Sequence, residues 1–315
     1  MKKNLTAYLL WPLSVIYTLV SKIVFLTRAR RQTTDDGRHI ICVGGLLAGG
    51  VGKTPAVYSI AKYLPKSAIV MRGYRGKKSG RVAAADTASD VGDEAKMQFS
   101  AGLPVFVGAD RNVSIANAAG AGFANIIMDD GFQNPTVRRD LSIVVFNGDI
   151  GVGNGFVLPA GPLRETLRAG LRRANAVLIM GDDKTGLVKK IRAAAPQLPV
   201  FYAALKEKIP AIKNKNIIVF SGIGYPEKFF ARIRGEYKNK SITATAFADH
   251  HQYTNADIEN LLAAANAADA ALITTEKDWV RLPAGARKKI AVAKLETTIE
   301  PKFWRWLDGY DKKAN

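Results

Sequence analysis

The sequence predicts an α/β protein built as two α/β/α sandwich domains with mainly parallel sheets. Two observations carry this prediction: short β-branched and apolar runs alternate with helical stretches, and the alternation starts again after a polar stretch at 206–216. A chain of 315 residues is long enough for two domains of ordinary size. We therefore expect an N-terminal helix at 1–31, a first domain at 32–205 and a smaller C-terminal α/β domain at 206–315.

The first expected element is an apolar helix. Residues 5–26 (LTAYLLWPLSVIYTLVSKIVFL) approach the ~20 apolar residues that a membrane span needs. Pro12 and Lys22 interrupt the run and basic residues flank both ends, which favours a helix dipped into one leaflet of an anionic membrane. A single-pass span, or a helix packed on the protein's own core, are the alternatives. No small-residue cleavage site follows, so we expect no cleaved signal peptide.

The following elements alternate in type. In the first domain we expect strands at 39–44, 68–72, 104–107, 125–128, 141–146 and 176–180, and helices that include 53–63, 94–100 and 111–120. In the second domain we expect strands at 217–221, 242–247, 270–274 and 290–295, with helices at 227–234 and 255–268. The Lys/Asn-rich polar stretch between these two series marks the expected domain boundary.

The composition narrows the classes of function. One cysteine, Cys42, excludes an internal disulfide and any site built from several cysteines, and it fits a reducing compartment. The chain has 46 basic and 27 acidic residues, a net charge of +19. Such a charge predicts an anionic partner, which is nucleic acid, an anionic membrane or a phosphorylated substrate. Because no nucleic-acid module and no interleaving of aromatic and basic residues is present, we expect no nucleic-acid partner.

A glycine-rich segment carries the strongest chemical signal. In HIICVGGLLAGGVGKTP (39–55) an apolar strand leads into a glycine-rich turn, Lys-Thr and a helix, which is the context of a P-loop. Backbone amides of Gly49, Gly50 and Gly52 can point at phosphate oxygens, Lys53 can neutralise them, and Thr54 can ligate Mg²⁺. The first domain is therefore predicted to be P-loop NTPase-like.

The match to the P-loop pattern is incomplete. Leu47 stands where the pattern places its first glycine. The local sequence resembles the deviant Walker loop of the nitrogenase-iron-protein class, but Ala48 replaces the extra lysine of that class. A tight strand–helix turn without a ligand is the alternative.

Carboxylates and histidines lie at expected strand and helix ends. Asp129 and Asp130 end an apolar strand, where an acid can hold Mg²⁺, although Asp-Gly is also common in solvated turns. Asp93 opens the helix at 94–100 and on its own fits an N-cap better than a catalytic role. Two of the three histidines, His250 and His251, follow a strand of the second domain, where a structural histidine is the alternative.

Taken together, the motifs are similar to those of the tetraacyldisaccharide 4′-kinase family. Besides the apolar N-terminal segment, the matching pieces in the family's order are GGVGKTP (49–55), RGYRG (72–76), VGDE (91–94), DDGFQ (129–133), GPLRE (161–165), GIGYPEKFF (222–230), FADHHQY (247–253) and TTEKDWVRL (274–282). The resemblance implies a P-loop domain and a second α/β/α domain. It also implies ATP-dependent phosphorylation of the 4′-hydroxyl of an acylated disaccharide 1-phosphate, at the cytoplasmic face of the bacterial inner membrane.

The resemblance also implies roles for individual residues. Lys53 and Thr54 match the phosphate- and Mg²⁺-binding loop, and Asp93 matches the catalytic carboxylate with His250 as its partner. The acidic loop near metal and phosphate corresponds to Asp129, Asp130 and Gln133, while Glu94 and Glu165 are further candidates for metal or water ligands. The expected cofactors are ATP and Mg²⁺, and no obligate protein partner is inferred.

Several positions depart from the family's pattern. The family has Gly-Asn-Leu-Thr where this chain has Gly-Gly-Leu-Leu (44–47), Met71 replaces a serine, and Thr166 replaces a proline. None of these changes removes a group that the chemistry requires. The competing hypothesis is a membrane-associated deviant-Walker ATPase that acts as a switch.

Overall fold

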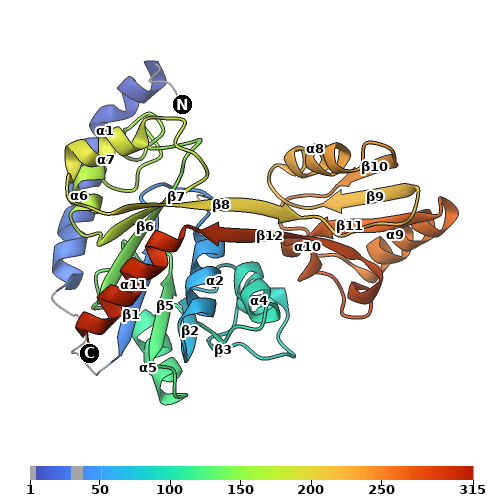
Figure 1. The fold of residues 1–315 in the computed structure, drawn as a ribbon, viewed down its shortest axis with the longest axis horizontal. Coiled ribbons are helices and arrows are strands. Elements are labelled where there is room, and N and C mark those ends of the chain that lie inside the picture. The colour runs from blue at the N-terminus through green and yellow to red at the C-terminus, as the bar shows by residue number, and fades with distance from the viewer. Residues whose placement is uncertain (1–4, 30–37, 51, 315) are drawn as a thin grey trace.

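The computed structural model describes residues 5–29, 38–50 and 52–314, and within them twelve strands form one continuous sheet (Figure 1). The order is β10-β9-β11-β12-β8-β7-β6-β1-β5-β2-β4-β3. Neighbours pair in parallel except for β12 with β8 and β3 with β4. The prediction of a mainly parallel α/β fold is therefore confirmed.

The larger part of the sheet is the seven-strand region that includes the expected glycine-rich turn. Its strands are β1 (His39–Gly44), β2 (Ser67–Met71), β3 (Gly80–Arg81), β4 (Val105–Val107), β5 (Asn125–Asp129), β6 (Leu141–Asn147) and β7 (Ala176–Met180). Every residue of β2, β4, β5 and β7 is buried, since helices cover both faces of a parallel sheet. The helices of this region are α2 (Lys53–Tyr63), α3 (Ala88–Val91), α4 (Asp93–Ser100), α5 (Arg111–Gly120), α6 (Leu167–Leu171) and α7 (Leu187–Ala194).

The smaller part consists of β9 (Asn216–Ser221), β10 (Ser241–Ala246) and β11 (Ala270–Thr275), with α8 (Pro226–Glu236), α9 (Asn255–Ala267) and α10 (Glu276–Trp279). Residues of β9 alternate between two apolar clusters. Ile217 and Val219 pack with residues of α8, whereas Ile218 and Phe220 pack with residues of α9. The two helices therefore cover opposite faces of this part (Figure 1).

A long antiparallel pair of strands joins the two parts. β8 (Val200–Lys208) runs beside β12 (Ala291–Ile299), and the first residues of β12 also pair with β11 (Figure 1). The sequence predicts no strand at 200–208, and the expected domain boundary falls within this segment. The strand was missed because buried and exposed residues alternate along it, so it lacks the continuous apolar run of the other strands.

The last helix returns to the larger part. α11 (Pro301–Ala314) places Phe303 and Leu307 in the same apolar core as β1, β6 and β7. A short helical turn, η1 (Arg287–Lys289), precedes β12. The chain after residue 205 thus forms the smaller part and also packs on the larger part through α11.

The N-terminal helix α1 (Leu5–Ala29) lies along the outer edge of the larger part (Figure 1). Ser14 attaches it: its hydroxyl donates to the carbonyl of Val157 at 2.8 Å and accepts the amide of Ala160 at 3.1 Å. Most large apolar side chains of α1 are exposed, and the helix is long and apolar enough to cross a membrane. The alternative of an apolar helix packed into the protein's own core therefore does not describe α1.

Candidate active site

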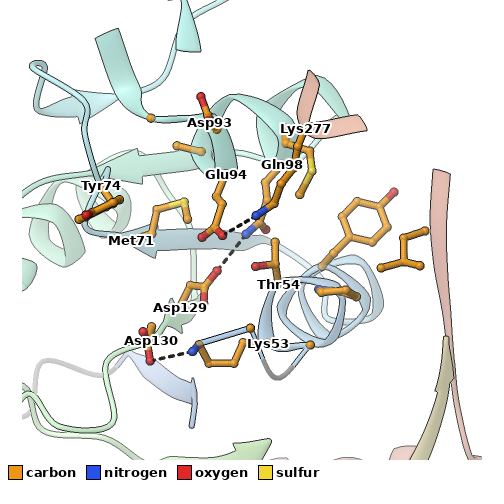
Figure 2. Close-up of a pocket in the computed structure, with 18 of the residues that line it drawn as sticks. Lys53, Thr54, Met71, Tyr74, Asp93, Glu94, Gln98, Asp129, Asp130 and Lys277 are labelled. Atoms are coloured by element: carbon orange, nitrogen blue, oxygen red, sulfur yellow. Dashed lines mark hydrogen bonds and ion pairs between the residues drawn. The ribbon is translucent and has the colours of Figure 1, made fainter. Parts of the chain in front are cut away.

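One cleft of about 2660 Å³ lies at the carboxyl ends of β1, β2 and β5 and reaches across to the smaller part (Figure 2). A cleft at this edge of an α/β sheet is the usual position of a ligand site. Of the expected site residues, Gly49, Gly50, Gly52, Lys53, Thr54, Asp93, Glu94, Asp129, Asp130, Gln133 and His250 line it. Glu165 does not, within the described part of the chain.

The glycine-rich loop (residues 44–54, of which 51 lies outside the described residues) leads from β1 into α2. Gly52 immediately precedes the helix with φ +88°, and a Cβ there would come 2.8 Å from Cγ of Met180. Only glycine fits this turn without strain. Lys53 and Thr54 therefore sit in the first turn of α2, where the amide dipoles favour an anion. Leu47, which departs from the P-loop pattern, is buried in the core.

Asp129 and Asp130 have opposite environments. Asp129 is buried at the end of β5 and accepts one hydrogen bond, from Gln98, at 3.1 Å. Burial, with the negative charges of Glu94 and Asp130 adding to it, raises the pKa of Asp129 to about 7. Asp130 is instead paired, because Arg164 holds it through two bonds of 2.9 and 3.1 Å and Nζ of Lys53 lies 3.4 Å away.

Gln133 and Glu165 belong to a polar chain behind these aspartates. Gln133 donates to the carbonyl of Gly45 at 3.0 Å and to Glu165 at 3.1 Å, and it accepts a bond from Arg164. Both carboxylate oxygens of Glu165 are bound by Arg173 at 2.5 Å. Glu165 is therefore placed to hold Gln133, while its own carboxylate is already neutralised.

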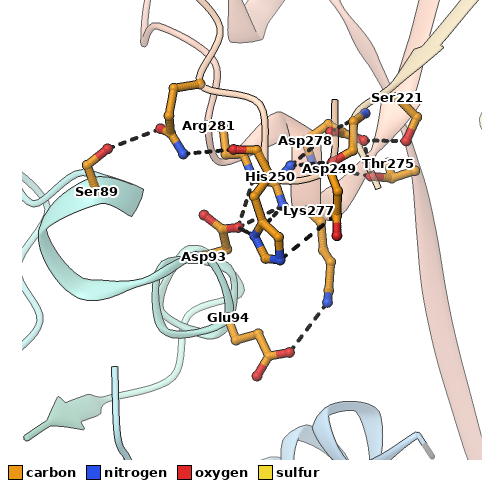
Figure 3. Close-up of polar contacts among 12 residues, drawn as sticks. Ser89, Asp93, Glu94, Ser221, Asp249, His250, Thr275, Lys277, Asp278 and Arg281 are labelled. Atoms are coloured by element: carbon orange, nitrogen blue, oxygen red, sulfur yellow. Dashed lines mark hydrogen bonds and ion pairs between the residues drawn. The ribbon is translucent and has the colours of Figure 1, made fainter. Parts of the chain in front are cut away.

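Asp93 does not act as a helix cap. Gly92 is the N-cap of α4, with φ +92° and no room for a Cβ, which would come 2.6 Å from the carbonyl oxygen of Tyr74. Asp93 follows as the first helical residue, and its Oδ2 lies 2.7 Å from Nδ1 of His250 across the cleft (Figure 3). Two residues that are 157 positions apart in the chain thus meet as a carboxylate–imidazole pair.

His250, and not its neighbour, reaches the cleft. His250 adopts a left-handed backbone with φ +61°, and its amide donates to the carbonyl of Gly222 at 2.9 Å. His251 instead binds Asp257 at 3.0 Å and packs against the aromatic rings of Phe247 and Tyr253. The alternative of a structural histidine therefore describes His251.

Arg281 is a site residue that the sequence analysis missed. Its guanidinium is fully buried and binds Oδ2 of Asp93 through Nε at 2.8 Å and Nη2 at 2.7 Å. The residue lies in the TTEKDWVRL motif, which was recognised as a whole and not residue by residue. A second cation of this motif, Lys277, lies 3.4 Å from Glu94 (Figures 2 and 3).

The donor atoms around Asp129 suit a small divalent cation. Asp129, Glu94 and Thr54 offer oxygen ligands on one side of the cleft, as Mg²⁺ prefers (Figure 2). Among the described residues no group of three His, Cys, Asp or Glu side chains forms a complete metal site. Mg²⁺ commonly takes one or two carboxylates from a protein and completes its shell with phosphates and water.

Comparison with known proteins gives one consistent family. The model of the tetraacyldisaccharide-1-P 4′-kinase family (LpxK) matches residues 6–311. Curated proteins named tetraacyldisaccharide 4′-kinase include one from Methylobacterium nodulans, 42% identical over 270 residues, which cover 82% of this chain and 79% of that protein. Another, from Paramagnetospirillum magneticum, is 39% identical over 307 residues, covering 92% and 90%.

The fold is also that of a solved structure. A crystal structure of LpxK from Aquifex aeolicus, described as an "apo" form in complex with ATP, superposes with a TM-score of 0.74 at 22% identity. The match covers 98% of this chain and 99% of that one. At this identity the match establishes the fold, while the family model and the curated relatives establish the family. The chain belongs to the tetraacyldisaccharide-1-P 4′-kinase family.

Proposed function

We propose that this chain transfers the γ-phosphoryl group of ATP to the 4′-hydroxyl of a tetraacyldisaccharide 1-phosphate in lipid A biosynthesis. The observation that carries the proposal is the Asp93–His250 pair, 2.7 Å apart, in the same cleft as Lys53 and the glycine-rich loop. A phosphoryl acceptor and a phosphoryl donor can therefore be bound within one cavity. The family membership supplies the substrate class.

The glycine-rich loop and Lys53 are proposed to hold ATP. Amides at the start of α2 face the β- and γ-phosphates, and Lys53 contributes positive charge that counts most as the phosphoryl group is transferred. Asp130, held by Arg164, keeps Lys53 directed to this place. We propose Gln133 as a further residue at the phosphates, with Glu165 fixing its amide.

Asp93 is proposed to accept the proton of the 4′-hydroxyl. The hydroxyl oxygen then forms a bond to the γ-phosphorus as the bond to the β-γ bridging oxygen breaks, and ADP leaves. His250 orients Asp93 and supports its charge through the 2.7 Å contact. Most of the rate acceleration then comes from placing the two substrates and neutralising charge.

Thr54, Asp129 and Glu94 are proposed as protein ligands of Mg²⁺. When bound, Mg²⁺ supplies positive charge to the phosphates of the nucleotide. Asp129 is suited to this role because it is buried beside two other carboxylates, and among the described residues its side chain accepts a hydrogen bond from Gln98 alone. In the absence of a cation this negative charge is poorly compensated.

The N-terminal helix is proposed to lie in the cytoplasmic face of the inner membrane. Its exposed side carries large apolar residues, and the basic charge of the whole chain favours an anionic surface. The acyl chains of the substrate would stay in the leaflet while the disaccharide enters the cleft. We retain the division at residue 205 as a proposal. The separate apolar cores of the two parts support it, except that Phe303 and Leu307 of α11 pack in the core of the larger part.

The test is incubation of the purified full chain with radiolabelled ATP and tetraacyldisaccharide 1-phosphate in detergent micelles. We expect a phosphorylated lipid that depends on the chain, and at least ~10²-fold less product with Lys53→Ala, because Lys53 provides charge to the transition state. Matched unfolding temperatures show that the variant is folded. ATP hydrolysis that membranes stimulate without phosphorylated lipid would instead support the switch ATPase, which the family assignment does not favour.

A further inference from the structure

Arg281 joins the two sides of the cleft at the reacting carboxylate. Nε of its guanidinium donates to Oδ2 of Asp93 at 2.8 Å, and Nη2 lies 2.7 Å from the same oxygen as an ion pair (Figure 3). Nη1 donates to the carbonyl of Gly222 at 2.9 Å and to Asp278 at 3.2 Å. The first contact reaches α4 in the larger part, and the others lie in the smaller part. The side chains of Arg281 and Asp278 are fully buried.

Asp278 fixes Arg281 in place. Its two oxygens accept hydrogen bonds from the hydroxyls of Ser221, Thr275 and Tyr253, at 2.6–2.9 Å, and from the amide of Gly222 at 2.8 Å. A carboxylate with this many donors has one orientation. Arg281 therefore reaches Asp93 from a fixed position in the smaller part.

The carbonyl of Gly222 also connects Arg281 with His250. The oxygen of Gly222 accepts both the amide of His250 and Nη1 of Arg281, each at 2.9 Å. Nη2 of Arg281 lies 3.4 Å from Nδ1 of His250. The arginine and the histidine thus approach Asp93 as one unit.

These contacts leave Asp93 with one oxygen for chemistry. Oδ2 receives His250 Nδ1 and two guanidinium nitrogens, whereas no hydrogen bond from the described residues reaches Oδ1. The side chain remains about a tenth exposed. The donors on Oδ2 turn the carboxylate so that Oδ1 is available to an acceptor hydroxyl.

We propose that Arg281 is a positioning residue for phosphoryl transfer, which holds the Asp93–His250 pair together and directs Oδ1 of Asp93 to the acceptor. This inference rests on the proposed kinase function. Arg281 itself does not touch the substrate. Its loss should therefore slow the chemical step, because an error of ~1 Å in the position of a reacting group can cost ~10²-fold in rate. Binding of ATP at Lys53 should be unaffected.

The test compares Arg281→Met and Arg281→Lys with the wild-type full chain in the micelle assay. We expect kcat to fall ~10²-fold in Arg281→Met, with KM for ATP unchanged. Arg281→Lys should recover part of this loss, because an ammonium keeps the charge but cannot reproduce the fork that holds Asp93, Gly222 and Asp278 at once. Arg234→Met is the matched control, since Arg234 is half-exposed and pairs only with Glu227 among the described residues.

A second measurement separates positioning from folding. Removing Arg281 leaves the buried Asp278 without its cation and Asp93 with His250 as its remaining partner among the described residues, so the unfolding temperature of every variant is recorded. In an Asp93→Asn background, Arg281→Lys should cause little additional loss of kcat, because the carboxylate that it orients is already gone. This comparison also decides the question if Arg281→Met fails to fold.

Three results would overturn the inference. They are a folded Arg281→Met variant that keeps more than about half of wild-type kcat, a loss confined to KM for ATP, or losses that multiply independently in the Asp93→Asn background. If the wild-type chain itself forms no phosphorylated lipid, the proposed function fails and this inference fails with it. If the wild type is active and the Arg281→Met variant is equally active, only the proposed role of Arg281 is refuted.

Discussion

Asp129 and Asp130 are neighbours in the chain, yet their carboxylates lie in opposite electrostatic environments. The Asp130 carboxylate is paired with Arg164 and Lys53, whereas that of Asp129 is buried beside further negative charge. The raised pKa of Asp129, about 7, means that folding disfavours its ionised form. A residue that lowers the stability of the folded protein without ligand, and that lies near the expected phosphates, is typical of a functional site.

Asp129→Asn should therefore stabilise the protein without metal while abolishing kinase activity. With EDTA present, the stability gain should be largest above about pH 7, where the folded Asp129 carboxyl is ionised. Below that pH the folded chain retains a proton that the unfolded chain has lost, so the gain should shrink by at most ~1.4 kcal/mol per pH unit towards pH ~4. Chemical unfolding at several pH values measures this.

Asp130→Asn is the matched control for this experiment. It removes a paired charge, so it should lower stability or leave it unchanged. A gain of stability from Asp129→Asn that does not vary with pH would contradict the explanation by burial.

Asp93 and His250 should behave as one functional unit. Asp93→Ala removes the proposed proton acceptor, and His250→Ala removes the group that orients it at 2.7 Å. The double variant should be scarcely slower than the slower single variant, as expected for residues that act together. The measurement is kcat of all four proteins at saturating ATP. Losses that multiply would show that the two side chains act separately.

At the scale of elements, α1 is an addition to the fold and not part of its core. Ser14 binds the loop at 157–160, and the guanidinium of Arg173 lies 4.4 Å from the ring of Phe25. The remaining contacts leave the large apolar side chains of α1 exposed. This exposed apolar surface, with basic residues on both sides of it in the sequence, is the reason for proposing that α1 lies in a membrane.

Deleting residues 1–31 should release the protein from membranes. Catalysis on the lipid should fall more than basal ATP hydrolysis, because the glycine-rich loop and Lys53 lie outside the deleted segment. Co-sedimentation with membranes and the two rates provide the measurement. Ser14→Ala is the control, since it removes the hydrogen bonds to the loop and keeps the apolar face of α1. If the truncated chain still sediments completely at high salt, another surface dominates binding.

Other elements show which sequence patterns are informative. β1 and β7 begin and end where the sequence predicts, because each is a continuous apolar run that is buried on both faces. The sequence does not predict β8, because its buried and exposed residues alternate. It does not predict α11 either, because residues after 205 are expected to form a separate domain and no helix is expected at 301–314. Their positions depend on partners that are distant in sequence, β12 for β8 and the core of the larger part for α11.

At the scale of the whole molecule, the net charge of +19 is the dominant electrostatic property. We expect the full chain to bind vesicles that contain anionic phospholipid more tightly than zwitterionic vesicles. Raising the salt from ~0.05 M to ~0.5 M should weaken this difference, since the screening length shortens from well over ~10 Å to under ~5 Å. Sedimentation with both kinds of vesicle measures it. Equal binding to the two vesicle types at low salt would show that the net charge does not contribute, and that the apolar helix alone attracts the protein to the membrane.

The sequence by itself determined the parts of this protein whose signal is local. Alternating apolar runs specify the mainly parallel sheet, and ordered motifs specify the family, because hydrophobic periodicity and short catalytic segments are written in neighbouring residues. Only the tertiary structure shows which acids are paired and that Arg281 completes the group. It also places His250, the histidine that the family motif indicates, beside Asp93, and His251 beside Asp257. The contacts of Asp93 with His250 and Arg281 join the two parts of the sheet that β8 and β12 connect. They link side chains more than 150 positions apart, and no local pattern encodes such a distance.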